Sequence, residues 1–262
     1  MEVNIYKLDA FTDKLFSGNP AAVCILNEWI DEDIMQNIAT ENNLAETAFI
    51  VQKDNLYEIR WFTPLVEVEL CGHATLAGAY VLMNKLNVTS NSIHFYSHLS
   101  GDLFVRKLDN ELFELDFPTD KYQECNLPDI IKESLNIIPQ ECYKGKTDFL
   151  LVYDTQTDIE NISPDLKILS KADGRGIIVT SQGKDCDFVS RFFAPQSGID
   201  EDPVTGSAHT TLTPYWAKRL NKTKLEAVQL SERKGYLTCT FQNERTRIAG
   251  KVVLFLKGKI HL

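Results

Sequence analysis

The chain has 262 residues, 44% of them hydrophobic, and its 27 Lys and Arg against 37 Asp and Glu give a formal net charge of −10. This length suffices for one large domain or two modest ones with a buried core. The acidic balance argues against nucleic acid or an anionic membrane as a partner, because both need clustered basic side chains. A small anionic substrate stays compatible with it, because a binding site can be locally positive.

The first residues contain no basic segment followed by an apolar run, so we expect no signal peptide. The longest strongly apolar run, 74–83, is about half of the roughly 20 residues that a membrane span needs. Six cysteines are scattered without a CxxC pair, which is typical of reduced thiols. We therefore expect a cytoplasmic protein, with most of these cysteines in its core.

The first half of the chain predicts a sheet around a helix. The hydrophobic pattern predicts strands at 3–9, 22–26, 46–52, 57–62, 92–97, 102–107 and 111–117, and helices at 30–41 and 73–86. The helix at 73–86 is apolar on nearly every side and carries no charge before Lys85. Such a helix should be buried all round, so we expect the sheet to wrap around it.

The best candidate for a domain boundary is the segment Pro118–Thr119–Asp120 with the polar stretch that follows it. It divides the chain into domains at 1–118 and 119–262, with the last strand able to pack back on the first. The second half predicts helices near 127–136 and from about Ser207, and strands near 149–153, 176–180, 186–194, 235–241 and 246–256.

A short pattern occurs once in each half. RWFTP (60–64) and RFFAP (191–195) both place two aromatic residues after an arginine and end on a small residue and a proline. Each leads to a glycine turn before a predicted helix, CGHAT in the first half and TGSAH in the second. We interpret this order as a duplicated domain rather than a chance match.

The two glycine turns are candidate anion sites. A helix start exposes unpaired N–H groups, and the helix dipole adds partial positive charge there. Gly72–His73 and Gly206–Ser207 would present two such ends, and together they could bind one carboxylate or phosphate. Neither turn matches a nucleotide-binding glycine pattern, so a nucleotide site has little support.

Glu46 stands at the edge of an apolar predicted strand. A partly desolvated carboxyl group has a raised pKa and can act as a general acid or base near neutral pH. The alternative is a solvated acid at a strand end, and the residues alone favour it. We interpret the acids at 67, 69, 200 and 201 as solvated acids as well.

Three other polar residues are candidates with structural alternatives. Asp202 precedes a proline that fixes the backbone, and it could orient the imidazole of His73. Ser207 is a good helix N-cap whatever else it does. Cys71 and His73 are too few for a recognisable zinc pattern, so we expect no metal.

At this point several longer motifs resemble the PhzF-like proteins of phenazine biosynthesis, which belong to the diaminopimelate-epimerase-like superfamily. The motifs are GNPAAV (18–23), NLAETAF (43–49), RWFTPLVEVELCGHATLA (60–77) and RFFAPQSGIDEDPVTGSAHTTLTPYWAKRL (191–220). They lie in both halves, so the resemblance spans nearly the whole chain, although residues 120–175 carry little of it.

The resemblance implies a mixed α/β (α+β) fold of two pseudo-symmetric domains, each a curved sheet or barrel around a central helix, with the active site in the cleft between them. It implies a homodimer and a biosynthetic, cofactor-independent isomerase that moves a proton between carbons of a dihydro-hydroxyanthranilate-like carboxylate. Glu46 matches the general acid/base. His73, Asp202 and Ser207 match the groups that assist it, and the turns at Gly72 and Gly206 would bind the substrate carboxylate.

The related epimerases use two opposed cysteines, one from each domain. Cys71 matches the first, but the second turn offers Thr205 and Ser207 and no thiol. This favours one carboxylate, Glu46, that performs both proton transfers. Two alternatives stay open: an amino-acid racemase or epimerase in which Cys71 is a base, and a non-catalytic protein that binds a metabolite.

Overall fold

The computed structural model describes residues 1–262, which divide into two units with separate interiors. The first unit is Met1–Asp116 together with Ala249–Leu262, and the second is Phe117–Ile248. The chain leaves the first unit in β8 (Phe113–Pro118) and returns to it in β16 (Arg245–Gly250). The last strand therefore belongs to the first unit.

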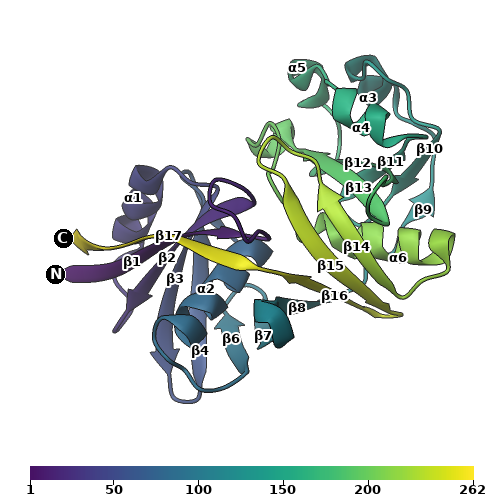
Figure 1. Ribbon diagram of the computed structural model, residues 1–262. Helices are drawn as coiled ribbons and strands as arrows, with labels where there is room; N and C mark the ends of the chain where they lie inside the picture. The colour runs from purple at the N-terminus through teal and green to yellow at the C-terminus, as the bar shows by residue number, and fades with distance from the viewer. The chain divides into compact units, whose positions relative to one another are not determined.

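The first unit contains one mixed sheet (Figure 1). Strands β2 and β3 are parallel, as are β4 and β6, and the other neighbours that pair within the unit are antiparallel. In spatial order the strands are β17 (Val252–His261), β1 (Glu2–Ala10), β2 (Asn19–Leu26), β3 (Glu46–Lys53), β4 (Leu56–Phe62), β6 (Ser92–Ser97), β7 (Gly101–Lys107) and β8, with the short β5 (Glu67–Val68) beside β4.

Helix α2 (Gly72–Asn84) occupies the interior of this unit. It contacts β17 and β1 near one end of the sheet order and β7 near the other, so the sheet curves around it. From His73 to Met83 only Tyr80 is not buried, which confirms the expected burial on all sides. Gly78 allows close approach, because a Cβ there would lie 2.8 Å from Cδ1 of Ile50.

Helix α1 (Glu32–Asn42) covers the other face of the sheet. The carboxylate of Asp31 accepts the N–H of Asp33 and so caps the helix, because the first N–H groups of a helix have no partner within it. Met35 and Ile38 pack among outward-facing strand residues such as Phe49. Glu46, Ala48 and Ile50 alternate with these and share the opposite face, towards α2.

The second unit has its own mixed sheet. Its parallel pairs are β11 with β12 and β13 with β14, and the other pairs described within it are antiparallel. The order is β9 (Gln123–Glu124), β10 (Glu141–Lys144), β11 (Asp148–Val152), β12 (Gly176–Gln182), β13 (Phe188–Phe193), β14 (Lys224–Gln229) and β15 (Gly235–Gln242), followed by β16.

Helix α6 (Ala208–Leu220) is the central helix of the second unit. It contacts β11, β14 and β15, and Trp216 donates its indole N–H to the hydroxyl of Thr180 in β12. Three short helices contribute to the cluster on the other face of the sheet: α3 (Asp129–Ser134), α4 (Gln156–Asn161) and α5 (Leu166–Leu169).

The two units share one order of pairings, as the duplication hypothesis predicts. In each unit, two parallel strands connected by one or two helices come first (β2 and β3, β11 and β12), and a hairpin to the next strand follows (β4, β13). That strand then pairs in parallel with the strand after the central helix (β6, β14), and two antiparallel strands complete the order. The matching arginines also make matching contacts. Arg60 pairs with Glu67 and lies 5.2 Å from the Phe62 ring, while Arg191 pairs with Glu201 and lies 4.8 Å from the Phe193 ring.

These ion pairs correct one expectation. Glu67 and Glu201 are not merely solvated acids, because each binds its arginine with both carboxylate oxygens. Such a paired geometry is the strong form of a charge-assisted hydrogen bond. Both acids therefore fix the turn between a strand and the central helix of their unit.

One strand prediction is wrong, and strand β14 (Lys224–Gln229) is missed. The strand expected at 246–256 is wrong, because the segment is divided between β16 and β17, which meet at Lys251. Strand β14 was not predicted, since its charged residues at 224 and 226 interrupt the apolar pattern. No helix in residues 1–262 is long and apolar enough to cross a membrane.

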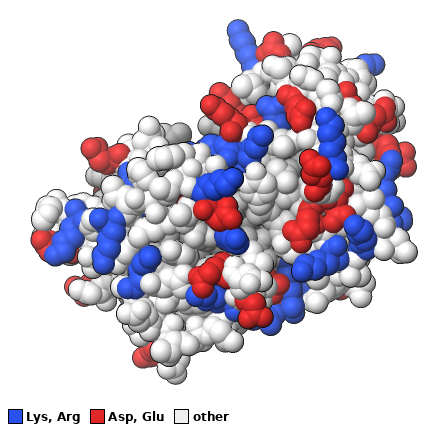
Figure 2. Space-filling model, viewed as in Figure 1, with Lys and Arg blue, Asp and Glu red and all other residues white.

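Figure 2 shows acidic and basic side chains side by side over much of the face that it draws. This is the arrangement expected when the net charge of −10 is a difference between two large numbers of opposite charges, 27 and 37.

Candidate active site

Glu46 and His73 come together within the first unit. Glu46 is the first residue of β3 and points to the side of the sheet that α2 occupies, while His73 is in the first turn of α2. Nε2 of His73 lies 3.2 Å from Oε2 of Glu46, and the two side chains are 7% and 13% exposed. The fold thus pairs two predicted site residues that are 27 positions apart in the sequence.

The environment of His73 keeps its imidazole neutral. Burial lowers the pKa of His73 below its usual value of 6.5, although the Glu46 carboxylate and a hydrogen bond to the backbone of Pro20 act in the opposite direction. Since a proline offers only its carbonyl, His73 must donate a ring N–H to it. The imidazole is therefore held in place on one side and faces a carboxylate on another.

Cys71 completes a group of three around His73. Its Sγ lies 3.5 Å from Nδ1 of His73, at the N-cap position of α2. One ligand atom from each of Glu46, Cys71 and His73 lies within 4.8 Å of the others, which is close enough to hold a metal ion. A carboxylate, a thiolate and an imidazole are all zinc ligands. The expectation that the protein uses no metal stays a prediction.

The start of α2 presents backbone N–H groups beside this group. The first hydrogen bond of the helix runs from the N–H of Thr75 to the carbonyl of Cys71, and the Thr75 hydroxyl donates to the same carbonyl. The N–H groups of Gly72, His73 and Ala74 therefore have no acceptor within the helix. Together with the helix dipole they favour an anion at this end.

In the second unit, Asp202 belongs to a loop that a buried glutamine holds. Gln229, at the end of β14, is 1% exposed. Its Oε1 accepts the N–H of Thr205 at 2.8 Å, and its Nε2 donates to the carbonyl of Asp202 at 2.7 Å. The Thr205 hydroxyl donates to Oδ2 of Asp202 at 2.5 Å. Gln229 thereby fixes the threonine that orients the Asp202 carboxylate.

Replacing Gln229 by Leu should lower the free energy of unfolding by about 1–3 kcal/mol, because it leaves the buried N–H of Thr205 without its acceptor. Urea titration followed by circular dichroism measures this change. Gln242→Leu is the matched control at an exposed strand end and should leave the midpoint unchanged. Equal midpoints for the Gln229 variant and the wild type would show that the glutamine does not hold the loop.

Gly206 and Ser207 lie at the start of α6. A Cβ built on Gly206 would meet no heavy atom within 4 Å, so the backbone here borders open space. Ser207 occupies the N-cap position, but its hydroxyl makes no capping hydrogen bond, and the prediction that it caps the helix through its side chain is wrong. The residue has helical backbone angles and is exposed.

The histidine of the TGSAH turn has a structural role that the sequence did not reveal. His209 is completely buried, and its Nδ1 donates to the carbonyl of Thr205 at 2.8 Å. Burial lowers its pKa from 6.5 to about 4. Because the unfolded chain binds this proton more readily, the neutral histidine contributes full stability above about pH 6.5, and that stability is lost as the pH falls towards 4.

Acid should therefore destabilise the second unit through His209. The shift corresponds to about 3 kcal/mol of unfolding free energy lost between pH 7 and 4. His209→Asn keeps a donor for Thr205 and does not titrate, so its stability should fall less over this range, as urea titrations at pH 7, 5.5 and 4 would measure. A wild type and a variant with parallel pH profiles would contradict this role, and the exposed His98→Asn serves as the control.

The predicted residues thus form two groups. Glu46, Gly72 and His73 meet in the first unit, and Asp202, Gly206 and Ser207 belong to one loop and helix start in the second. Sequence reasoning missed Gln229, since its strand was not predicted. A polar residue at the end of an otherwise hydrophobic alternation, LEAVQL, was the available signal.

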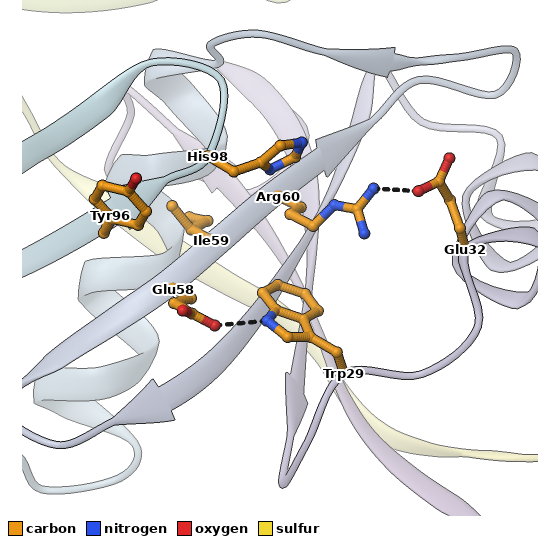
Figure 3. A pocket seen from close by; sticks show the side chains of 7 residues that line it. All are labelled: Trp29, Glu32, Glu58, Ile59, Arg60, Tyr96 and His98. Carbon is orange, nitrogen blue, oxygen red and sulfur yellow. Dashed lines mark hydrogen bonds and ion pairs between the residues drawn. The ribbon is translucent and has the colours of Figure 1, made fainter.

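A pocket of about 300 Å³ lies on the first unit, on the face of β4 that carries Glu58 and Arg60 (Figure 3). Its polar groups already have partners: the indole N–H of Trp29 donates to Glu58, and Arg60 pairs with Glu32 of the lining and with Glu67 outside it. None of the predicted site residues lines it. Its central arginine already has the structural role described for the repeated motif.

Comparison with known proteins identifies relatives over the full length. Residues 8–258 match the PhzC–PhzF family, described as phenazine biosynthesis-like protein. An uncharacterized isomerase of Pseudomonas aeruginosa is 48% identical over 262 residues, which cover all of both chains. The crystal structure of a PhzF-family phenazine biosynthesis protein from Enterococcus faecalis has a TM-score of 0.97, with 46% identity and full coverage of both chains.

More distant structures share the fold. A hydroxyproline epimerase from Agrobacterium vitis has a TM-score of 0.63 at 8% identity, and it covers 99% of this chain and 92% of its own. These findings confirm both the resemblance and the mixed α/β, epimerase-like fold that the sequence predicted.

Proposed function

Because the chain belongs to the PhzC–PhzF family of phenazine biosynthesis-like proteins, we propose that it is a cofactor-independent isomerase that moves a proton between two carbons of a small carboxylate. Several relatives at 42–48% identity are named as isomerases, which supports the reaction class. The substrate class, a dihydro-hydroxyanthranilate-like ring acid, comes from the family resemblance.

Glu46 is the proposed general acid/base. The observation that supports this role most is the 3.2 Å contact between its carboxylate and the buried His73. The imidazole, anchored by its N–H to the backbone of Pro20, lies against one oxygen of Glu46, which leaves the other oxygen for the substrate. Ionised Glu46 would take a proton from one carbon, and the same carboxyl group, now protonated, would return it to another. A placed acid/base of this kind contributes about 10²–10⁴-fold to the rate.

The helix starts supply the second part of the proposal. The N–H groups from Gly72 onward would hold the substrate carboxylate or the negative charge that develops as the carbon loses its proton. In the second unit, the family resemblance assigns a substrate-binding role to Gly206 and Ser207 and an assisting role in proton transfer to Asp202. The bonds from Thr205 and Gln229 support a fixed orientation for Asp202.

Deuterium incorporation tests the reaction class. The protein would be incubated in D₂O with a panel of small cyclic and amino-acid carboxylates, including a dihydro-hydroxyanthranilate, and carbon-bound exchange followed by NMR. The proposal predicts catalytic exchange in at least one ring acid. Tight binding of a panel member, measured by calorimetry, without any exchange or conversion to product would instead support the non-catalytic metabolite-binding alternative.

One observation keeps the racemase or epimerase alternative open. The Cys71 thiol lies against His73, and a thiol at a helix start next to an imidazole can become a base. The corresponding turn in the second unit has Thr205 and Ser207 and lacks the opposing thiol of a two-base enzyme. Exchange at the α-carbon of an amino acid, lost in Cys71→Ser, would favour this alternative.

A further inference from the structure

Two cysteines of the second unit face each other across a short ladder. Strand β9 pairs antiparallel with β10 in the register Gln123 with Lys144 and Glu124 with Tyr143. The next step of the same register sets Cys125 opposite Cys142. Their Sγ atoms are 3.5 Å apart, and the N–H of Cys125 donates to the carbonyl of Cys142 at 3.0 Å.

This geometry is close to that of a disulfide. A disulfide needs its sulfur atoms about 2.05 Å apart and its Cα atoms within roughly 4.4–6.8 Å, which directly opposed antiparallel residues satisfy. The two sulfur atoms must therefore approach by about 1.5 Å, a distance that side-chain rotation can supply. None of the other four cysteines has a thiol partner among the sulfur contacts described.

We propose that Cys125 and Cys142 form an intramolecular disulfide when the protein meets a hydroperoxide, and that this pair is an oxidation site separate from the active site. Cys125 is partly exposed, whereas Cys142 is buried in the cluster beneath α3. Cys125 is therefore the thiol that the peroxide reaches first.

The reaction balances without a cofactor. The Cys125 thiolate attacks one peroxide oxygen, the O–O bond breaks, and water leaves after protonation, so that Cys125 becomes a sulfenic acid. The Cys142 sulfur then attacks the Cys125 sulfur and gives up its proton, the S–O bond breaks, and a second water leaves. Two thiols lose two electrons in all, and hydrogen peroxide is reduced to two water molecules.

The protonation of Cys142 agrees with this order. Burial and the neighbouring Cys125 thiol raise the pKa of Cys142 to about 12, so it is a thiol at neutral pH. A protonated thiol is a poor nucleophile towards peroxide. In the second step Cys142 gives up this proton as it attacks the adjacent sulfenic acid, whose contact with it compensates for the small thiolate fraction.

The bond would fix the entry of the chain into the second unit. Strand β9 has only two residues, and all four of Gln123, Glu124, Tyr143 and Lys144 are exposed or half-buried. A bond between 125 and 142 would close a loop that contains α3 and would anchor β9 covalently to β10. We expect the oxidised protein to resist limited proteolysis at 118–125 better than the reduced protein.

Peptide mapping tests the proposal directly. Trypsin cleavage after Lys121, Lys132 and Lys144 separates the cysteines into peptides 122–132 and 133–144. After brief treatment with stoichiometric hydrogen peroxide and alkylation of the remaining thiols, the two peptides should appear joined, with a mass two hydrogen atoms below their sum. Reduction should separate them again.

Variants identify the pair. Cys125→Ser and Cys142→Ser should each abolish the joined peptide, while Cys186→Ser, a partly exposed control in the same unit, should leave it unchanged. Recovery of Cys125 and Cys142 as alkylated thiols in the treated wild type would overturn the proposal. So would a Cys125 oxidised only to sulfinic or sulfonic acid, or a joined peptide that persists in either variant.

Discussion

Replacing Glu46 by Gln should lower kcat/KM by at least about 100-fold, because the amide cannot take or return a proton. The change is nearly isosteric and sits at the start of β3, so the fold should be retained. Carbon-bound deuterium exchange and turnover of the same ring acid, measured side by side, should decline together. Binding of the substrate should change much less than the rate.

Glu69→Gln is the matched control for this experiment. Glu69 lies in the exposed turn before α2 and should tolerate the change at full activity. Retention of at least half of the wild-type exchange rate by the Glu46 variant, with the control also active, would remove Glu46 from the chemical step.

The second large effect is expected at His73. His73→Leu removes the imidazole that contacts the Glu46 carboxylate at 3.2 Å, and we expect kcat to fall by about 10²-fold, since a displaced catalytic group costs about that much. His73→Gln should restore part of the loss, because its amide can donate to the carboxylate. Steady-state kinetics of the three proteins measures the comparison.

The pH dependence gives an independent check on His73. Since burial lowers the pKa of His73, its imidazole stays neutral as the pH falls through 6.5. We therefore expect kcat of the wild type and of His73→Gln to depend on pH in the same way around pH 6.5. A wild-type transition near the ordinary histidine pKa that the variant lacks would mean that the protonated imidazole has a different role. His94→Leu, at a more exposed position, should keep its activity and serves as the control.

Local sequence patterns predicted the elements that carry the fold. The uninterrupted apolar character of 73–83 indicated a helix enclosed by sheet, and α2 is enclosed in this way. The repeated arginine–aromatic motif indicated a duplication, and the two units share both their pairing order and their arginine–glutamate contacts. These features were predictable because the spacing of apolar residues and the repeated arginine–aromatic motif can both be read from short stretches of the chain.

Long-range contacts were not predictable in the same way. The apolar periodicity of β3 and α2 predicts both elements but does not place Glu46 beside His73, which depends on how a sheet closes around a helix. Gln229 was missed because a buried polar residue is recognisable only from the loop that it holds. The strand expected at 246–256 failed because the residue pattern TRIAGKVVLFL does not show where the chain passes from one unit to the other.

The central claim is that one carboxylate removes and returns the same proton. A single-turnover experiment in H₂O, with a substrate that carries deuterium at the carbon that is deprotonated, tests it most directly by mass spectrometry of the product. If Glu46 performs both steps, part of the deuterium should reappear at the new carbon of the same molecule. Complete loss of the label to solvent, together with loss of turnover in Cys71→Ser, would contradict the account and assign the reaction to two separate bases.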